Sequence, residues 1–276
     1  KADKMIVASV FLFDNMYSTN KPQYDVVKAF TDLLIEKKRT NPDISISIIL
    51  DPMNRAYNNR VSPSVQRFVD NGIDVFYSDL LPTKAATRHG GFEKARHVSR
   101  FFNELTLGAG GSIWDFATSA PIPGVKYELD GEKISLSLIR EASLIKANHR
   151  KILVTDSKRG KYEAMISSAN PHNASDSSTN FALSVKGDLA KFIYGVLRED
   201  VAHSLVQWHN RPLAFGKHGF MHLSRESKDK YGIKRVKSKG MINYLNKHLP
   251  PVKWDKLMTA HKNSKVKAAF VSEIEI

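Results

Sequence analysis

Residues suited to phosphate chemistry lie close together between positions 149 and 170. Of the ten histidines, only His149 is followed two residues later by a lysine, Lys151, and Asp156 comes five residues after that lysine. The tetrapeptide Ser167-Ser168-Ala169-Asn170 follows downstream. In a strand, residues i and i+2 point to the same face. The imidazole of His149 and the ammonium of Lys151 can therefore converge on one point, where a phosphodiester would meet a nucleophile and a cation together.

The residue types suggest a role for each side chain. A neutral imidazole is available near neutral pH, which makes His149 the candidate nucleophile. Lys151, Ser168 and Asn170 are hydrogen-bond donors and are the candidate phosphate ligands. Donors aimed at the non-bridging oxygens stabilise the charge that builds on phosphorus, by about 3–4 kcal/mol each. We expect Asp156 to orient the site by hydrogen bonding, and this chemistry requires neither a metal nor a cofactor.

A strand hairpin must position these residues. The short apolar segments 151–155 and 163–167 are predicted strands, and the polar turn 157–160 joins them. The second strand returns beside the first, so its end lies next to the start of the first strand. The hairpin therefore predicts that the phosphate ligands come to lie beside the nucleophile.

The N-terminal part of the chain alternates between strand and helix signals. Buried strands are predicted over 5–13, 44–50 and 73–77, and amphipathic helices over 25–38 and 62–70. Short connections in this β-α-β-α-β order are typical of a sheet with helices on both faces. Further predictions are strands over 133–139, where apolar residues alternate cleanly, and over 181–185, and helices over 189–208 and 241–248. Weaker signals predict a helix over 93–105 and the start of a strand over 266–270.

The stretch from Asn148 to Asp156, together with residues 167–170, resembles the HKD signature of the phospholipase D superfamily. That signature reads H-x-K, four residues, Asp, and then G-S-x-N or a close variant. Further segments are similar to the first catalytic half of bacterial cardiolipin-synthase-like members: 49–54, 72–75, 78–80, 146–151 and 168–172. The resemblance spans roughly residues 5–205. It implies an α/β fold of the phospholipase D type, an α-β-α sandwich in which helices cover both faces of a mixed sheet.

The resemblance also implies a reaction. Members act in two steps through a covalent phosphohistidine, which would form on His149. A second histidine protonates the leaving group and then activates water or an alcohol, and an alcohol acceptor makes the enzyme a phosphatidyltransferase. The implied substrate is a phospholipid, as in cardiolipin synthesis. An endonuclease of the same superfamily that acts as a dimer is the alternative.

The chain departs from the family pattern at three places. Ten residues separate Asp156 from Ser167, where the family has about six, and Ser167 takes the place of the usual glycine. Many members carry N-x-E after the motif, whereas this chain has Asn180-Phe181-Ala182. His172 or Asp176 could replace that glutamate, but we interpret both as loop residues.

Family members build one site from two HKD motifs, and this sequence contains one. We expect the second motif to come from a partner chain or from a C-terminal half that this sequence lacks. The domain prediction is a catalytic half over residues 1–205. Residues 206–276 are then a basic linker with the start of a second half.

The charge of the chain predicts an anionic partner. Lys and Arg number 42 against 28 Asp and Glu, a formal net charge of +14, and residues 206–276 hold 15 of the former and 5 of the latter. The basic segment suits an anionic membrane surface to which the protein binds peripherally, or nucleic acid. A non-catalytic module that binds acidic surfaces is a third hypothesis. The absence of cysteine excludes disulfides, thiolate metal sites and a cysteine nucleophile.

Other motifs are weaker candidates. Asp14 and Asp51 end predicted strands and either line the site or cap turns, and we favour turns. Asn173-Ala174-Ser175 matches a glycosylation sequon. The glycine-rich run 108–111 has no phosphate-loop lysine after it, so we interpret it as a loop.

Overall fold

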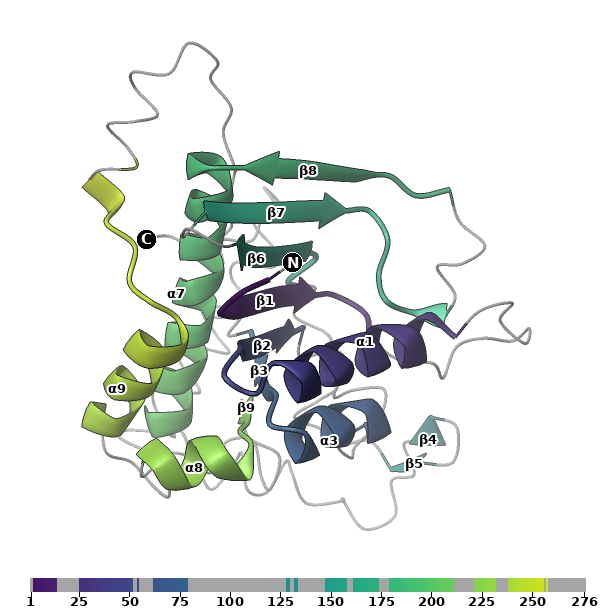
Figure 1. Cartoon of the computed structure of the whole chain (residues 1–276). Coiled ribbons are helices and arrows are strands. Elements are labelled where there is room, and N and C mark those ends of the chain that lie inside the picture. Colours follow the sequence, from purple (N-terminus) through teal and green to yellow (C-terminus); the bar gives the residue numbers. More distant parts are fainter. Residues whose placement is uncertain are drawn as a thin grey trace, which may run out of the picture.

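The computed structural model gives the chain an α/β fold (Figure 1). The residues that the structure describes are 2–13, 25–51, 54, 62–78, 128–129, 132–133, 147–157, 161–173, 179–210, 221–231, 238–255 and 257. Within these residues, the fold consists of a seven-stranded mixed sheet, five helices and a separate two-stranded ladder. The predicted α/β class is thereby confirmed.

The seven strands lie in the order β8-β7-β6-β1-β2-β3-β9. Their bounds are β1 (Met5–Val10), β2 (Ser45–Leu50), β3 (Asp74–Tyr77), β6 (Lys151–Ser157), β7 (Lys161–Ser167), β8 (Ala182–Lys186) and β9 (Met221–His222). β1, β2 and β3 are parallel, β6 to β8 form an antiparallel meander beside β1, and β9 is antiparallel to β3. The separate ladder pairs β4 (Glu128–Leu129) with β5 (Glu132–Lys133). The carboxyl ends of β1 to β3 thus share one sheet edge with the start of β6 and the end of β7.

Helices cover both faces of this sheet (Figure 1). Their bounds are α1 (Val26–Thr40), α3 (Pro63–Asp70), α7 (Asp188–Asn210), α8 (Arg225–Tyr231) and α9 (Ser238–His248). α1 and α3 lie on one face, and α7 and α9 pack against the other. In β1, Ile6 and Ala8 point toward α1 and α3, whereas Met5 and Val7 point toward α7. Burial from both sides explains why this strand is a continuous apolar run.

Capping residues set the ends of α1 and α3. The carboxylate of Asp25 accepts the backbone N–H of Lys28 at 2.9 Å and caps α1. The hydroxyl of Ser62 accepts the backbone N–H of Val65 at 3.2 Å and caps α3. Gly72 follows α3 with a φ of 76°, a left-handed conformation that glycine adopts at no steric cost.

Two predicted strands differ from the observed ones. β1 ends at Val10, before the predicted end at residue 13, because the carbonyl of Phe11 accepts the side-chain amide of Asn54 instead of extending the ladder. β5 overlaps the strand predicted over 133–139 at Lys133 alone. Residues 134–139 and the elements predicted over 93–105 and 266–270 lie outside the described residues.

The basic C-terminal segment is built into the same sheet. β9 pairs with β3, and neither β9 nor α8 was predicted from the sequence. α7 continues across the boundary predicted after residue 205. The core on the α7 side includes apolar side chains from this segment: Met221, Leu223, Met241, Tyr244 and Leu249. The described part of 206–276 is therefore an integral layer of the fold rather than a linker, because sparse apolar residues between the lysines anchor it.

A buried carboxylate at the start of β3 holds this segment to the sheet. Asp74, 3% exposed, accepts hydrogen bonds from the backbone N–H of Ser224 (2.7 Å) and from the hydroxyls of Ser227 (2.8 Å) and Tyr244 (2.6 Å). Ser227 belongs to α8 and Tyr244 to α9, so one carboxylate joins three elements. Burial and the neighbouring Asp74 raise the pKa of Tyr244 well above its usual value, which keeps the phenol protonated as a donor.

Replacing Asp74 with alanine should destabilise the fold, because three donors would lose their buried acceptor. Hydrogen bonds to charged groups are strong, so we expect the free energy of unfolding to fall by about 2–4 kcal/mol in urea denaturation. Asp43→Ala removes an exposed carboxylate from the turn before β2 and should change stability by less than about 0.5 kcal/mol. Equal losses in the two variants would contradict the role given to Asp74.

Candidate active site

The candidate site lies at the sheet edge where the parallel strands end. Lys151 pairs with Val10, which puts the start of the antiparallel strand β6 beside the carboxyl end of β1. Ile152 pairs with Ile166, so β7 ends at the same edge. His149 is exposed at this edge, whereas Lys151 is 8% exposed. The hairpin predicted from the sequence is present, and it brings the end of β7 to the start of β6.

Lys151 and His149 lie against the same aromatic ring. The Nζ of Lys151 donates to the backbone carbonyl of His149 at 2.9 Å and lies 4.9 Å from the ring centroid of Phe11. The imidazole centroid of His149 lies 4.5 Å from the same ring. The structure therefore brings the predicted nucleophile and the predicted cation together. Phe11 was not predicted as part of the site, although its place directly after a buried strand is a usable signal.

Burial sets the charge state of Lys151. Loss of solvent lowers the pKa of its ammonium to about 8, and the carboxylate of Asp51 acts in the opposite direction. The cationic form therefore predominates at neutral pH. A cation that is partly withdrawn from water attracts an anion more strongly than an exposed lysine does, because the local dielectric constant is lower.

Asn148 ties the start of β6 to the ends of all three parallel strands. Its side-chain amide donates to the hydroxyls of Ser9 (3.1 Å) and Ser78 (2.6 Å), and its backbone N–H donates to the carboxylate of Asp51 (2.5 Å). Asn148 and Asp51 are both buried. Asp51 thus has a third role besides the two considered from the sequence: it holds the residue that precedes the predicted nucleophile.

Arg150 anchors the same segment on the α7 side of the sheet, opposite the side of His149 and Lys151. Its guanidinium forms an ion pair with Asp200 of α7, and the two side chains are 13% and 4% exposed. Side chains alternate along an extended segment, so Arg150 points away from its neighbours on either side. Sequence reasoning missed this pair, and the available signal was a carboxylate among the apolar residues of the helix over 189–208.

Asn170 lies where the sequence predicts. Its side-chain oxygen accepts the backbone N–H of Leu12 at 3.1 Å, directly after Phe11. The oxygen and nitrogen of an amide point in different directions, so the NH2 group of Asn170 is directed away from Leu12 and can donate elsewhere. The residue thus reaches the edge where β1 ends and β6 begins.

The two serines are arranged differently from the prediction. The hydroxyl of Ser168 accepts the backbone N–H of Phe181 at 3.0 Å and donates to the side chain of Asn180 at 3.1 Å, so the two residues that precede β8 hold it. Ser167 follows Ile166 in the ladder and therefore comes next to Lys151 in register. The match to G-S-x-N gives the ligand role to Ser168, whereas the hairpin register brings Ser167 next to Lys151.

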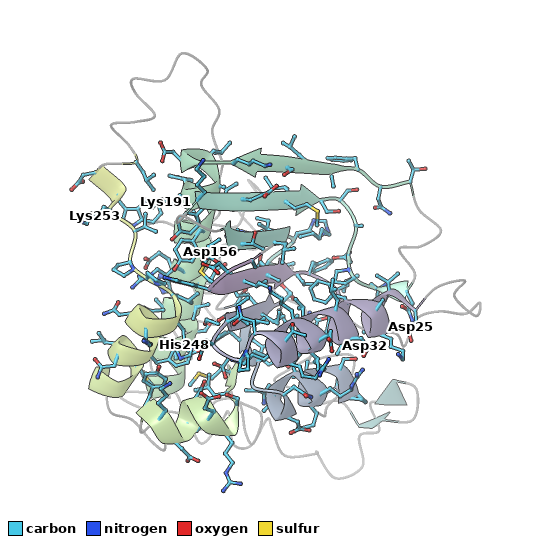
Figure 2. All side chains as sticks on the ribbon, in the orientation of Figure 1. Asp25, Asp32, Asp156, Lys191, His248 and Lys253 are labelled. Carbon is cyan, nitrogen blue, oxygen red and sulfur yellow. The ribbon has the colours of Figure 1, made fainter. Side chains whose placement is uncertain are left out.

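Asp156, labelled in Figure 2, lies near the start of β1, whereas Lys151 at the other end of β6 pairs with Val10 at the end of β1. The carboxylate of Asp156 accepts the backbone N–H groups of Lys4 (2.9 Å) and Met5 (2.7 Å) and so holds the start of β1. Five residues of extended strand span about 17 Å, and an odd separation changes the face. The expectation that Asp156 hydrogen-bonds within the site is therefore wrong for this fold: Asp156 fixes the strand that leads to the site.

The weaker candidates have mixed outcomes. Asn173 of the sequon is 4% exposed, and its side-chain oxygen accepts the backbone N–H of Val27 at 3.3 Å in the first turn of α1. A glycan does not fit at a side chain in this position. His172 is also buried, at 6% exposure. Asp14, Asp176 and the glycine run 108–111 lie outside the described residues.

The structure was also searched for metal sites and membrane-spanning helices, and the chain was compared with known proteins. Across the described ranges, no group of three or more His, Asp or Glu side chains is placed to hold a metal ion. No helix in the described part of the chain is both long and apolar enough to cross a membrane. In comparisons with known proteins, no family model, curated protein or solved structure matches this chain.

Replacing Lys151 with methionine should stabilise the protein at neutral pH. Folding lowers the pKa of the ammonium from 10.5 to about 8, so the unfolded state binds this proton more tightly. We expect K151M to raise the free energy of unfolding at pH 7 by about 1–2 kcal/mol. The gain should shrink as the pH rises from about 8 toward 10.5, because the folded protein then no longer holds a charged ammonium away from water, and the difference between the states disappears when the unfolded chain also loses the proton.

Urea denaturation at neutral pH and near the upper end of this range measures both effects. K186M is the matched control, since Lys186 is a strand residue whose side chain is 74% exposed. We expect no comparable gain in that variant. A loss of stability in K151M, or a gain that does not change with pH, would contradict the assignment.

Proposed function

We propose that this protein cleaves or transfers phosphodiesters through a covalent phosphohistidine on His149, as a member of the phospholipase D superfamily. The observation that carries the proposal is the convergence of an exposed imidazole, a buried ammonium and an amide at one sheet edge: His149, Lys151 and Asn170. A mixed sheet with helices on both faces agrees with the sandwich that the superfamily resemblance implies.

The proposed reaction has two steps. A ring nitrogen of His149 attacks phosphorus, and the bond to the leaving oxygen breaks as that oxygen takes a proton from a second histidine. Water or an alcohol then gives its proton to the second histidine and attacks the phosphohistidine, which releases His149. Lys151 and the NH2 group of Asn170 stabilise the charge on the non-bridging oxygens in both steps. The second histidine belongs to a second motif, brought by a partner chain or by a further segment.

Phospholipid is the proposed substrate class. Phe181, whose backbone hydrogen-bonds to Ser168, is 74% exposed, and Leu183 two residues later is 56% exposed. Apolar side chains next to the site suit acyl chains or a bilayer surface better than they suit a polyanion in water. The net charge of +14 favours an anionic membrane surface. It equally favours nucleic acid, which is the second candidate.

The variant His149→Ala tests the chemistry. With phosphatidylglycerol vesicles as substrate, we expect turnover to fall about a thousandfold or more, because no covalent intermediate can form. Acid-quenched wild-type protein should carry labelled phosphate, and the variant should carry none. His203→Ala, at a partly buried position of α7, is the control and should retain activity. Full turnover by the His149 variant would overturn the proposal.

The same assay separates the rival substrates. Cleavage of a single-stranded oligonucleotide without lipid turnover supports the endonuclease, and its binding should weaken steeply with salt. Binding to anionic vesicles without turnover of either substrate supports the non-catalytic module. Turnover requires both the wild-type chain and the second motif. The assay should therefore be run on the chain alone and on the chain together with the partner chain or further segment that carries the second motif.

A further inference from the structure

Phe11 contacts both candidate groups of the site. Its ring centroid lies 4.5 Å from that of the His149 imidazole, with the planes tilted by 56°, and 4.9 Å from the Nζ of Lys151, which lies over the ring. Aromatic rings attract each other at centroid separations of about 4.5–7 Å, and a cation is attracted to a ring face within about 6 Å. A single ring is therefore placed to fix the positions of two side chains.

The peptide that carries this ring is held at three successive backbone groups. The carbonyl of Phe11 accepts the side-chain amide of Asn54 at 2.6 Å, and the N–H of Leu12 donates to Asn170 at 3.1 Å. The N–H of Phe13 donates to the side-chain oxygen of Asn54 at 2.7 Å. Two asparagines thus clamp the segment, and one of them is a predicted phosphate ligand.

The core on the α1 side holds the next ring of the same segment. Phe13 is 2% exposed and stacks on Phe68 of α3, with centroids 5.6 Å apart and planes inclined by 20°. It also meets the edge of Phe30 of α1 at 5.9 Å. The place of Phe11 is therefore determined by the two helices on this face and not by the site alone.

A ring suits this position for a chemical reason. A carboxylate in contact with Lys151 would neutralise the ammonium and repel a phosphate, whereas an aromatic face attracts the cation without a net charge. The ammonium has three donors, and it uses one on the carbonyl of His149. The ring thus stabilises a buried cation, and among the described residues the carbonyl of His149 is the one hydrogen-bond acceptor of the ammonium, which leaves two donors for a ligand. The charged or titratable groups around the ammonium are His149 and the carboxylate of Asp51, since Arg150 turns to α7.

We propose that Phe11 is a positioning residue of the active site. Its ring holds the imidazole of His149 and the ammonium of Lys151 at the separation at which one phosphodiester meets both. The inference rests on the proposed function, because it gives Phe11 a part in that reaction. It goes further by assigning the preorganisation of the site to a residue outside the motif.

The test compares variants with and without a ring. F11L and F11M keep an apolar side chain but remove the π face, and F11Y keeps the ring. NMR titration of the Lys151 side chain and of the His149 ring protons needs no substrate. We expect the pKa of Lys151 to fall by about half a unit in F11L and F11M, because the charged form loses the ring, and to stay near the wild-type value in F11Y. The His149 ring protons should lose their ring-current shift in the same two variants.

Turnover of phosphatidylglycerol vesicles provides the functional readout. We expect kcat to fall about tenfold in F11L and F11M with a smaller change in KM, and the alkaline limit of activity to move to lower pH. F11Y should restore the wild-type profile. F181L removes an exposed ring beside the site and should leave the Lys151 pKa unchanged.

The two proposals fail in different ways. Unchanged Lys151 titration and unchanged His149 shifts in both F11L and F11M would overturn the role of Phe11, whatever the activity. Loss of activity in F11Y equal to that in F11L would also overturn it. Absence of turnover in the wild-type protein with the second motif supplied would instead overturn the proposed function, while the titrations still decide whether the ring positions the two groups.

Discussion

The entry into β6 is the constraint on which the rest of the site depends. Asn148 hydrogen-bonds to Ser9 in β1, to Ser78 after β3 and, through its backbone N–H, to Asp51 after β2. These groups are buried, so a shifted register would leave several of them without partners at a cost of about 1–3 kcal/mol each. The register of β6 is therefore fixed at Asn148. This register in turn determines the face of the sheet to which each of the following side chains points.

Alternation then divides the next three residues between two environments. Arg150 reaches Asp200 of α7 on one face, and His149 and Lys151 meet the ring of Phe11 on the other. The ion pair holds the peptide on the α7 side, and the ring of Phe11 contacts the two candidate groups on the opposite side. This explains how His149 can have a defined position although it is exposed and lies just before the start of β6.

The residues at the starts of the parallel strands stabilise the fold, whereas the candidate site residues lie at the carboxyl ends of these strands. At the start of β1, Asp156 accepts two backbone N–H groups, and at the start of β3, Asp74 accepts three donors from the C-terminal segment. Both carboxylates therefore stabilise the fold by accepting buried hydrogen bonds. The chemistry-bearing residues gather at the opposite end, where ligands bind in open α/β sheets in general. The motif aspartate thus serves the site indirectly, by fixing the strand that carries Phe11 to the edge.

The sequence by itself determined most of the elements and the three groups that converge. Apolar runs, caps and a turn of known residue types identified β1 to β3, α1, α3 and the β6–β7 hairpin, because these signals are local. Only the tertiary structure decided which side chains meet across the sheet: the contacts of Asn148, the pairing of Arg150 with Asp200, the place of Phe11 and the remote position of Asp156. Those contacts join residues 50 to 152 positions apart, and strand order and register place them together. Spacing along the chain carries no information about strand order or register, so the motif could indicate the candidate groups but not the residues that hold them in place.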